Sequence, residues 1–160
     1  MTLVIFSLKN ERYAVDVKDV EEVIPLPAIT PLANQPTFVC GMIYLRGRAV
    51  PVIDLRKRLE FGNPTLELDN DIIVTRVDTL VTGLIVDKVL SVVDIEEPQL
   101  IDPPNMIKGT QLKYISAVAQ IDETHVILLD LQKMLAGGEA ATLRSLEITT
   151  GKAGALRHEL

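Results

Sequence analysis

The 160-residue sequence lacks tryptophan and has only one cysteine, two histidines, three phenylalanines and three tyrosines. The single Cys40 cannot form an intramolecular disulfide, so we expect a small core residue there. Because 48% of the residues are apolar and few of them are aromatic, the core must consist largely of Val, Ile and Leu. This composition favours strands, and the length suffices for a core without disulfides or metals.

A basic stripe and a long apolar run are also missing. The formal charge is −6 and the Lys and Arg residues are scattered, which argues against nucleic acid or an anionic membrane surface as a partner. A membrane-spanning helix needs about 18 uninterrupted apolar residues, and no segment offers such a run. The apolar run at residues 3–6 is too short for a signal-peptide core. We therefore expect a soluble, cytoplasmic protein that binds other proteins.

Catalytic motifs are sparse as well. The sequence contains no P-loop, dinucleotide fingerprint or nucleophile elbow. His125 and His158 have no second histidine at metal-ligand spacing, and Asp78-Thr79 is followed by Leu80 where an aspartic protease has Gly. We predict no catalytic residue, metal or cofactor and no enzymatic activity. The alternative, a barrel-based hydrolase or small-ligand binder, requires two carboxylates that converge on a cleft between the halves.

An internal duplication is the strongest feature of the chain. Residues 4–24 align without a gap with residues 73–93, and residues 41–59 align with residues 117–135. The first block pairs Val20 with Val89. The two blocks have different offsets, so each unit consists of two blocks joined by a connector of variable length.

The pattern within each unit predicts strands and one short helix. Apolar residues alternate in residues 4–8 and 13–17 around a turn at 9–11, which is typical of a hairpin. Residues 50–53 and 126–129 are apolar on both faces, so we expect them where the two units meet. Asp54 and Asp130 are expected N-caps of short helices, while the proline-rich connectors at 25–36 and 96–109 are expected to be irregular.

Together these patterns predict a mainly all-β fold of two small five-stranded barrels. We expect one domain over residues 1–136, with a first barrel at about 1–65 and a second at about 66–136. Residues 137–160 are expected to form a C-terminal helix and tail.

One stretch carries a family signature. Residues 36–56 contain Gly41, Leu45-Arg46-Gly47, Pro51 and Asp54-Leu55-Arg56. With these residues the sequence resembles the CheW family of chemotaxis proteins over residues 3–135, although Tyr44 stands where Asn is usual. Residues 11–13, 20–24 and 83–89 support the resemblance.

The resemblance implies two SH3-like barrels with a shared core and a non-catalytic scaffold in a two-component signal transduction system. Its partners would be the regulatory domain of the CheA histidine kinase and the cytoplasmic tip of a methyl-accepting chemoreceptor, so the protein would be recruited to membrane receptor arrays without inserting into the membrane. An alternative keeps the adaptor fold but places it in a pilus or surface-sensing pathway.

The resemblance also implies two sets of docking residues. The receptor set is Val20, Gly41, Arg46, Gly83, Val89 and Val92, and the kinase set is Glu22, Val23, Ile24 and Pro51. The receptor tip is a helical hairpin, so a seam between the barrels with glycine clearance and apolar valines suits it.

Each assignment has a plain alternative. In this alternative, the glycines would relieve crowding in a barrel bend and the valines would belong to the ordinary core. Pro51 would limit strand pairing instead of setting an edge for the kinase. Arg46 is either a receptor contact or a solvated hairpin tip. Its counterpart in the repeat is Asp122, so the position carries opposite charges in the two units and is not a simple folding requirement.

Overall fold

The computed structural model of the protein describes residues 1–62, 64–96, 100–101 and 113–135. The elements of the first half are β1 (Thr2–Leu8), β2 (Glu11–Asp16), the 3-10 helix η1 (Val17–Asp19), β3 (Val20–Pro25), β4 (Val39–Leu45), β5 (Arg48–Asp54) and α1 (Leu55–Arg58). Those of the second half are β6 (Asp71–Val77), β7 (Leu80–Val86), β8 (Lys88–Asp94), β9 (Leu100–Ile101), β10 (Ile115–Ile121), β11 (Thr124–Leu129) and α2 (Leu131–Met134). The predicted C-terminal helix lies outside the described residues.

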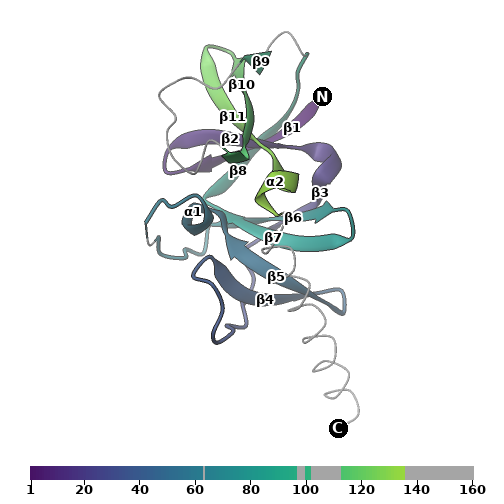
Figure 1. Ribbon diagram of the computed structural model, residues 1–160, viewed down its shortest axis with the longest axis vertical. Helices are drawn as coiled ribbons and strands as arrows, with labels where there is room; N and C mark the ends of the chain where they lie inside the picture. Colours follow the sequence, from purple (N-terminus) through teal and green to yellow (C-terminus); the bar gives the residue numbers. More distant parts are fainter. Residues whose placement is uncertain (63, 97–99, 102–112, 136–160) are drawn as a thin grey trace.

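The strands form two sheets that lie one above the other (Figure 1). Barrel A has the strand order β8-β1-β2-β11-β10-β9 and barrel B has the order β3-β6-β7-β5-β4. Strand β9 has only two residues, so each barrel has five long strands. The predicted mainly-β fold of two SH3-like barrels is confirmed. No helix in the described part of the chain is long and apolar enough to cross a membrane.

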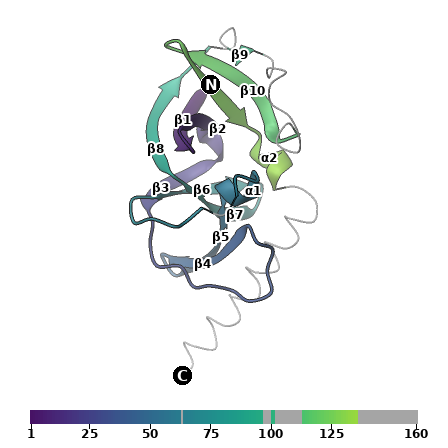
Figure 2. The same cartoon turned by 90° about the vertical axis from the view of Figure 1, so that its left-hand side faces the viewer.

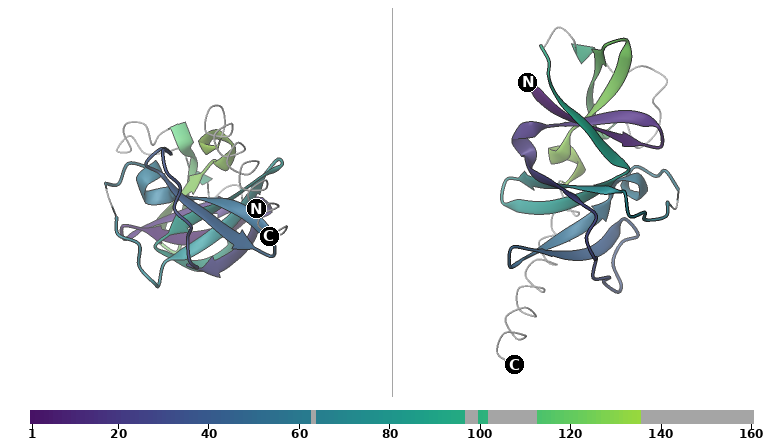
Figure 3. Two further views of the ribbon diagram at one scale, coloured as in Figure 1. Left: turned by 90° about the horizontal axis from the view of Figure 1, so that it is seen from below. Right: turned by 180° about the vertical axis from the view of Figure 1, so that it is seen from behind.

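The chain passes between the barrels twice, so the predicted division at residue 65 is wrong for the sheets. After β2 of barrel A, η1 leads into β3, which pairs with β6 of barrel B. After β7 of barrel B, the chain returns through Asp87 into β8, which pairs with β1 of barrel A. Each repeat unit thus gives its third strand to the hairpin of the other unit. Seen from behind, β8 runs upward from the waist and β3 runs downward (Figure 3).

The strand register repeats the sequence duplication. In barrel A, β11 pairs in parallel with β2 and places Leu128 opposite Ala14. In barrel B, β5 pairs in parallel with β7 and places Val52 opposite Gly83. These are equivalent residues of the two units, so a pseudo-twofold relation connects the barrels.

Apolar side chains pack in three clusters. Barrel A encloses residues such as Leu3, Ile5, Val126 and Leu128, and barrel B encloses their counterparts Ile72, Val74, Val50 and Val52. The third cluster, the shared core, takes residues from both barrels, among them Phe6, Tyr13, Ile53, Leu84, Leu129, Leu131 and Met134. Strands β5 and β11 therefore bury one face in their own barrel and the other in the shared core, as their apolar runs predicted.

The two short helices lie at the waist between the barrels (Figure 2). Asp54 Oδ1 accepts a hydrogen bond from the Arg56 amide at 3.0 Å, and Asp130 Oδ1 accepts one from the Lys133 amide at 3.1 Å. Both predicted N-caps are confirmed. The caps direct Leu55 and Leu131 into the shared core, where both are almost fully buried.

Candidate functional site

Val20 and Val89 lie where the chain passes from one barrel to the other. Val20 begins β3 and Val89 sits near the start of β8. Both side chains are half-buried and pack against the shared core. These two members of the receptor set therefore lie at the seam between the barrels and reach its surface only in part.

Two strands at sheet edges expose valines at equivalent positions. Strand β8 ends the sheet of barrel A and β3 ends that of barrel B. Val92 on β8 is 61% exposed, and its counterpart Val23 on β3 is 41% exposed. Leu90, also on β8, is 47% exposed. The molecule thus presents apolar side chains on two related strands. Val92 belongs to the predicted receptor set and Val23 to the predicted kinase set.

The two glycines of the receptor set face protein atoms and not an open seam. A Cβ atom at Gly41 would lie 2.1 Å from the carbonyl oxygen of Thr30, and its φ is +148°. Thr30 forms a bridge with Met42, so the connector needs this close approach. A Cβ at Gly83 would lie 3.1 Å from Ile72 and 3.3 Å from Val52. Their placement favours the relief of crowding.

Arg46 occupies the tip of the β4–β5 hairpin and binds a residue of the kinase set. Both Arg46 and Gly47 have positive φ, at 52° and 75°, as a tight type I′ hairpin turn requires. The Arg46 guanidinium donates to Glu22 Oε2 at 2.5 Å, with side-chain exposures of 75% and 20%. Sequence reasoning assigned the two residues to different partners, but the structure brings them together. Tyr44, beside this turn, is 52% exposed.

A second set of ion pairs reinforces the same edge. Glu21 accepts from Arg48 at 2.8 Å and from Arg76 at 2.6 Å. The hydrogen bond from Arg48, with that from Arg76, lowers the pKa of the Glu21 carboxyl below its ordinary value. These pairs tie β3 to the β4–β5 hairpin and to β6, so side-chain charges help close barrel B.

The remaining kinase residues lie behind this surface. Ile24 is half-buried against the barrel B core. Pro51 is buried in β5, which has β4 on one side and β7 on the other. The expectation that Pro51 sets an exposed edge is therefore wrong, because an interior strand has neighbours on both sides. Glu22 and Val23 are the members of the kinase set that reach the surface.

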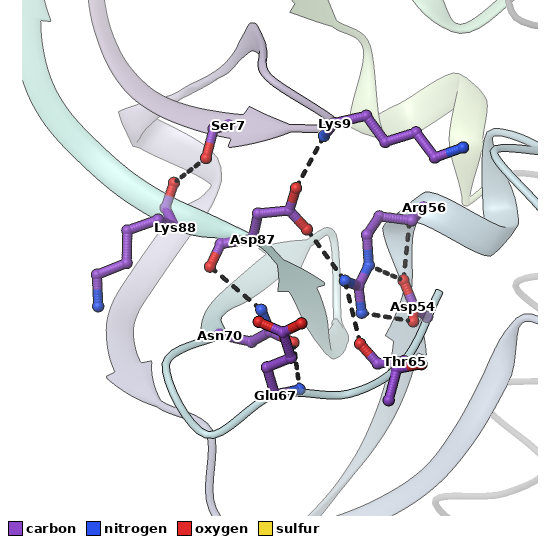
Figure 4. A network of polar contacts seen from close by, with 9 residues as sticks. All are labelled: Ser7, Lys9, Asp54, Arg56, Thr65, Glu67, Asn70, Asp87 and Lys88. Carbon is purple, nitrogen blue, oxygen red and sulfur yellow. Dashed lines mark hydrogen bonds and ion pairs between the residues drawn. The ribbon is translucent and has the colours of Figure 1, made fainter. Parts of the chain in front are cut away.

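Sequence reasoning missed a polar network around Arg56 at the waist (Figure 4). The Arg56 side chain is only 6% exposed and contacts both Asp54 and Asp87, in each case at 3.0 Å. A signal was present in the repeat, because Gln132 stands at the position equivalent to Arg56. This break in the repeat marks a feature that only one half of the molecule has.

The described residues offer little for catalysis. Asp54 is held by Arg56 and Asp130 caps a separate helix, so these two aspartates do not converge on one cleft. Burial raises the pKa of the Cys40 thiol, the opposite of an activated nucleophile. No group of three or more His, Cys, Asp or Glu residues able to hold a metal occurs in the described ranges.

Comparison with known proteins points to one family. A family model described as a CheW-like domain matches residues 2–139. The chain is 35% identical to the chemotaxis protein CheW of Thermotoga maritima over 130 residues, which cover 81% of this chain and 84% of that protein. It is 31% identical to the chemotaxis protein CheW of Klebsiella aerogenes over 137 residues, which cover 86% and 82%.

A solved structure has the same fold. The scaffolding protein TtCheW from Thermoanaerobacter tengcongensis matches with a TM-score of 0.77 and 33% identity, over 86% of this chain and 94% of that one. The family model extends over the strands of both barrels. By its sequence, its paired barrels and its shared core, the chain belongs to the family of CheW-like domains.

Proposed function

We propose that this chain is a non-catalytic scaffold that couples methyl-accepting chemoreceptors to the CheA histidine kinase, acting in the cytoplasm at receptor arrays. Its family makes it a chemotaxis coupling adaptor, and the proposal adds the partners and the surfaces that meet them. One observation carries the surfaces: equivalent strands β3 and β8 present different side chains on the two barrels. No specific observation favours the hydrolase or the non-chemotaxis pathway.

The receptor surface is formed by β8 and the adjoining seam. Val92 supplies exposed apolar area and Val89 and Val20 supply the half-buried floor at the waist. Such a strip fits the i, i+3, i+4 face of an amphipathic helix. Arg46 adds a charged group whose further N–H donors suit a carboxylate or the carbonyls at a helix end.

The kinase surface is formed by β3 with Glu22 and Val23. Ile24 supports this strand from within barrel B, whereas Pro51 is buried in β5, which β6 and β7 separate from β3 in the sheet, and acts without direct contact. A partner domain built on a similar fold would meet this strand through pseudo-symmetric, heterologous contacts. Two modest affinities joined in one scaffold then produce high avidity in an array.

The test uses the pair between Arg46 and Glu22. Arg46→Glu should weaken binding of a receptor signalling fragment about tenfold, or about 1.4 kcal/mol, in a calorimetric titration. The fold should remain intact because exposed ion pairs of this type contribute about 0–1 kcal/mol. Thermal unfolding of the variant checks this point.

A charge swap separates the two roles of Arg46. In the double variant Arg46→Glu with Glu22→Arg, the internal pair is restored with reversed polarity while the charge offered to a partner is reversed. We expect receptor affinity to remain low in the swap. Full recovery of affinity would mean that Arg46 serves only the internal pair, and unchanged affinity in Arg46→Glu alone would remove it from the receptor surface.

A further inference from the structure

Arg56 is buried at the waist and binds two carboxylates at once. Its Nε donates to Asp54 Oδ1 at 3.0 Å and its Nη2 donates to Asp54 Oδ2 at 3.1 Å. Its Nη1 donates to Asp87 Oδ1 at 3.0 Å. The guanidinium group therefore binds Asp54 at the start of α1 and, at the same time, Asp87, which lies in a different block of the repeat (Figure 4).

Asp87 lies at the point where the chain passes from barrel B to barrel A. It stands between β7 and β8, and its Oδ2 accepts from the Lys9 amide at 2.8 Å in the β1–β2 turn. Its own amide donates to the carbonyl of Ser7 at 3.1 Å. One carboxylate oxygen thus binds barrel B through Arg56, while the other binds barrel A through Lys9.

Charge and burial make this contact hard to rearrange. Burial alone would lower the pKa of Arg56, but Asp54 and Asp87 outweigh it and raise that pKa above its ordinary value. Asp54 is fully buried, so separation of Arg56 from it would leave an uncompensated charge. The guanidinium therefore has a fixed position from which it can hold Asp87.

Among the residues that the structure describes, the other passage between the barrels has no such contact. The positions equivalent to Arg56 and Asp87 are Gln132 and Lys18, and both are exposed. Lys18 pairs with Asp16 at 3.8 Å and its side chain is 75% exposed. The network is thus confined to one of the two passages.

A second arginine of α1 also reaches both barrels. The Arg58 guanidinium carbon lies 4.5 Å from the ring centroid of Tyr114 and 5.3 Å from that of Phe38. Tyr114 precedes β10 of barrel A, and Phe38 precedes β4 of barrel B. Helix α1 is therefore an inter-barrel contact in two independent ways.

We propose that Arg56 is a positioning residue that, through Asp87, fixes the angle between the two barrels. In this role it holds the strands β3 and β8 in one relative geometry. The proposal concerns the protein alone and does not depend on the identity of the partners. Because Asp54 would be left unpaired, Arg56→Ala is expected to disturb folding, so the test uses the other end of the contact.

The experiment compares Asp87→Ala with the unaltered network by electron spin distance measurement. Spin labels at Thr79 in the β6–β7 turn of barrel B and Gln120 on β10 of barrel A report the barrel angle, since both residues are exposed. All variants carry Cys40→Ala so that only these sites are labelled. We expect about a twofold broader distance distribution in Asp87→Ala, and hydrogen exchange of the Lys9 amide about tenfold faster.

A matched control distinguishes orientation from general weakening. Glu21→Ala removes a comparable charged group whose partners all lie within barrel B, and it should leave the distribution narrow. Asp87→Asn, which keeps an acceptor for Lys9, should give an intermediate width. An unchanged width in Asp87→Ala, with or without faster Lys9 exchange, would overturn the proposal, as would equal broadening in Glu21→Ala.

Discussion

Barrels A and B share strand order and register, but the side chains on their edge strands β8 and β3 differ. On β3 of barrel B, Glu21 and Glu22 are held by Arg48 and Arg46. On β8 of barrel A, the equivalent positions are Leu90 and Ser91, and Leu90 is 47% exposed. The hairpin tip that carries Arg46 in barrel B carries Asp122 in barrel A.

This contrast shows that the two halves of a duplicated fold can keep equivalent cores while their edge strands differ. Core positions stay equivalent because each barrel must bury the same layer of Val, Ile and Leu. Edge positions are free to diverge, since exposed substitutions cost little stability. The edge strand of barrel B is bound by charged side chains, while that of barrel A exposes more apolar area.

The largest expected effect lies in the shared core, where the halves also differ. Phe6 and Tyr13 stack with ring centroids 6.3 Å apart, whereas their counterparts are Thr75 and Thr82. Phe6 is fully buried, so Phe6→Ala should cost about 3–5 kcal/mol in urea unfolding. A single transition is expected because both barrels use this cluster. Two separate transitions would contradict a shared core.

A smaller loss is expected at Gly41. Gly41→Ala forces a Cβ to within 2.1 Å of the Thr30 oxygen and should cost about 1–3 kcal/mol. Barrel A already has Ala117 at the equivalent position, so the restriction belongs to the connector of barrel B. Gly47→Ala is the control: its φ is +75° but nothing lies within 4 Å. In thermal unfolding, Gly41→Ala should lower the unfolding temperature more than Gly47→Ala does. The reverse order would contradict the steric explanation.

Binding should divide between the two edge valines. Val92→Ser should weaken receptor binding about threefold to tenfold by loss of exposed apolar contact, with kinase-domain binding unchanged. Val23→Ser, its equivalent on the other barrel, should weaken kinase-domain binding and leave receptor binding unchanged. Parallel titrations of both variants against both partners measure this exchange. Equal losses for both partners in either variant would count against separate surfaces.

The smallest expected effect is a pH dependence at Glu21. Its folded-state pKa is lowered by hydrogen bonds from Arg48 and Arg76, so its stabilisation is present above the ordinary Glu pKa of about 4.3. It is lost as pH falls through the lower folded value. Glu21→Gln should cost about 0.5–1 kcal/mol at pH 7, and the difference from the native chain should shrink below about pH 4. If the difference in stability between Glu21→Gln and the native chain stayed constant in acid, these ion pairs would contribute nothing to stability.

The repeat predicted much of this fold. Aligned apolar positions and the caps Asp54 and Asp130 reappear at equivalent places, because burial and capping depend on local sequence. The exchange of third strands was not predictable in this way. Pairing of Val20 with Thr75 is a long-range contact, and a repeat looks the same whether its third strand stays or crosses.

The candidate site was predictable in part. The hairpin position of Arg46 follows from local pattern, whereas the sequence left open whether Val92 belongs to the core or to the surface, and the structure exposes it. That Arg46 binds Glu22, and that Pro51 lies in an interior strand, depends on how distant strands close the barrel. The network of Arg56 was visible only as a mismatch between the two halves of the repeat.

The central claim is that one chain binds receptor and kinase at the same time through different barrel surfaces. It is tested most directly by immobilising a receptor signalling fragment and measuring retention of the CheA regulatory domain with and without this protein. The account predicts that the kinase domain is retained only when the protein is present, in a ternary complex. Retention that is equal without the protein, or displacement of one partner by the other, would contradict it.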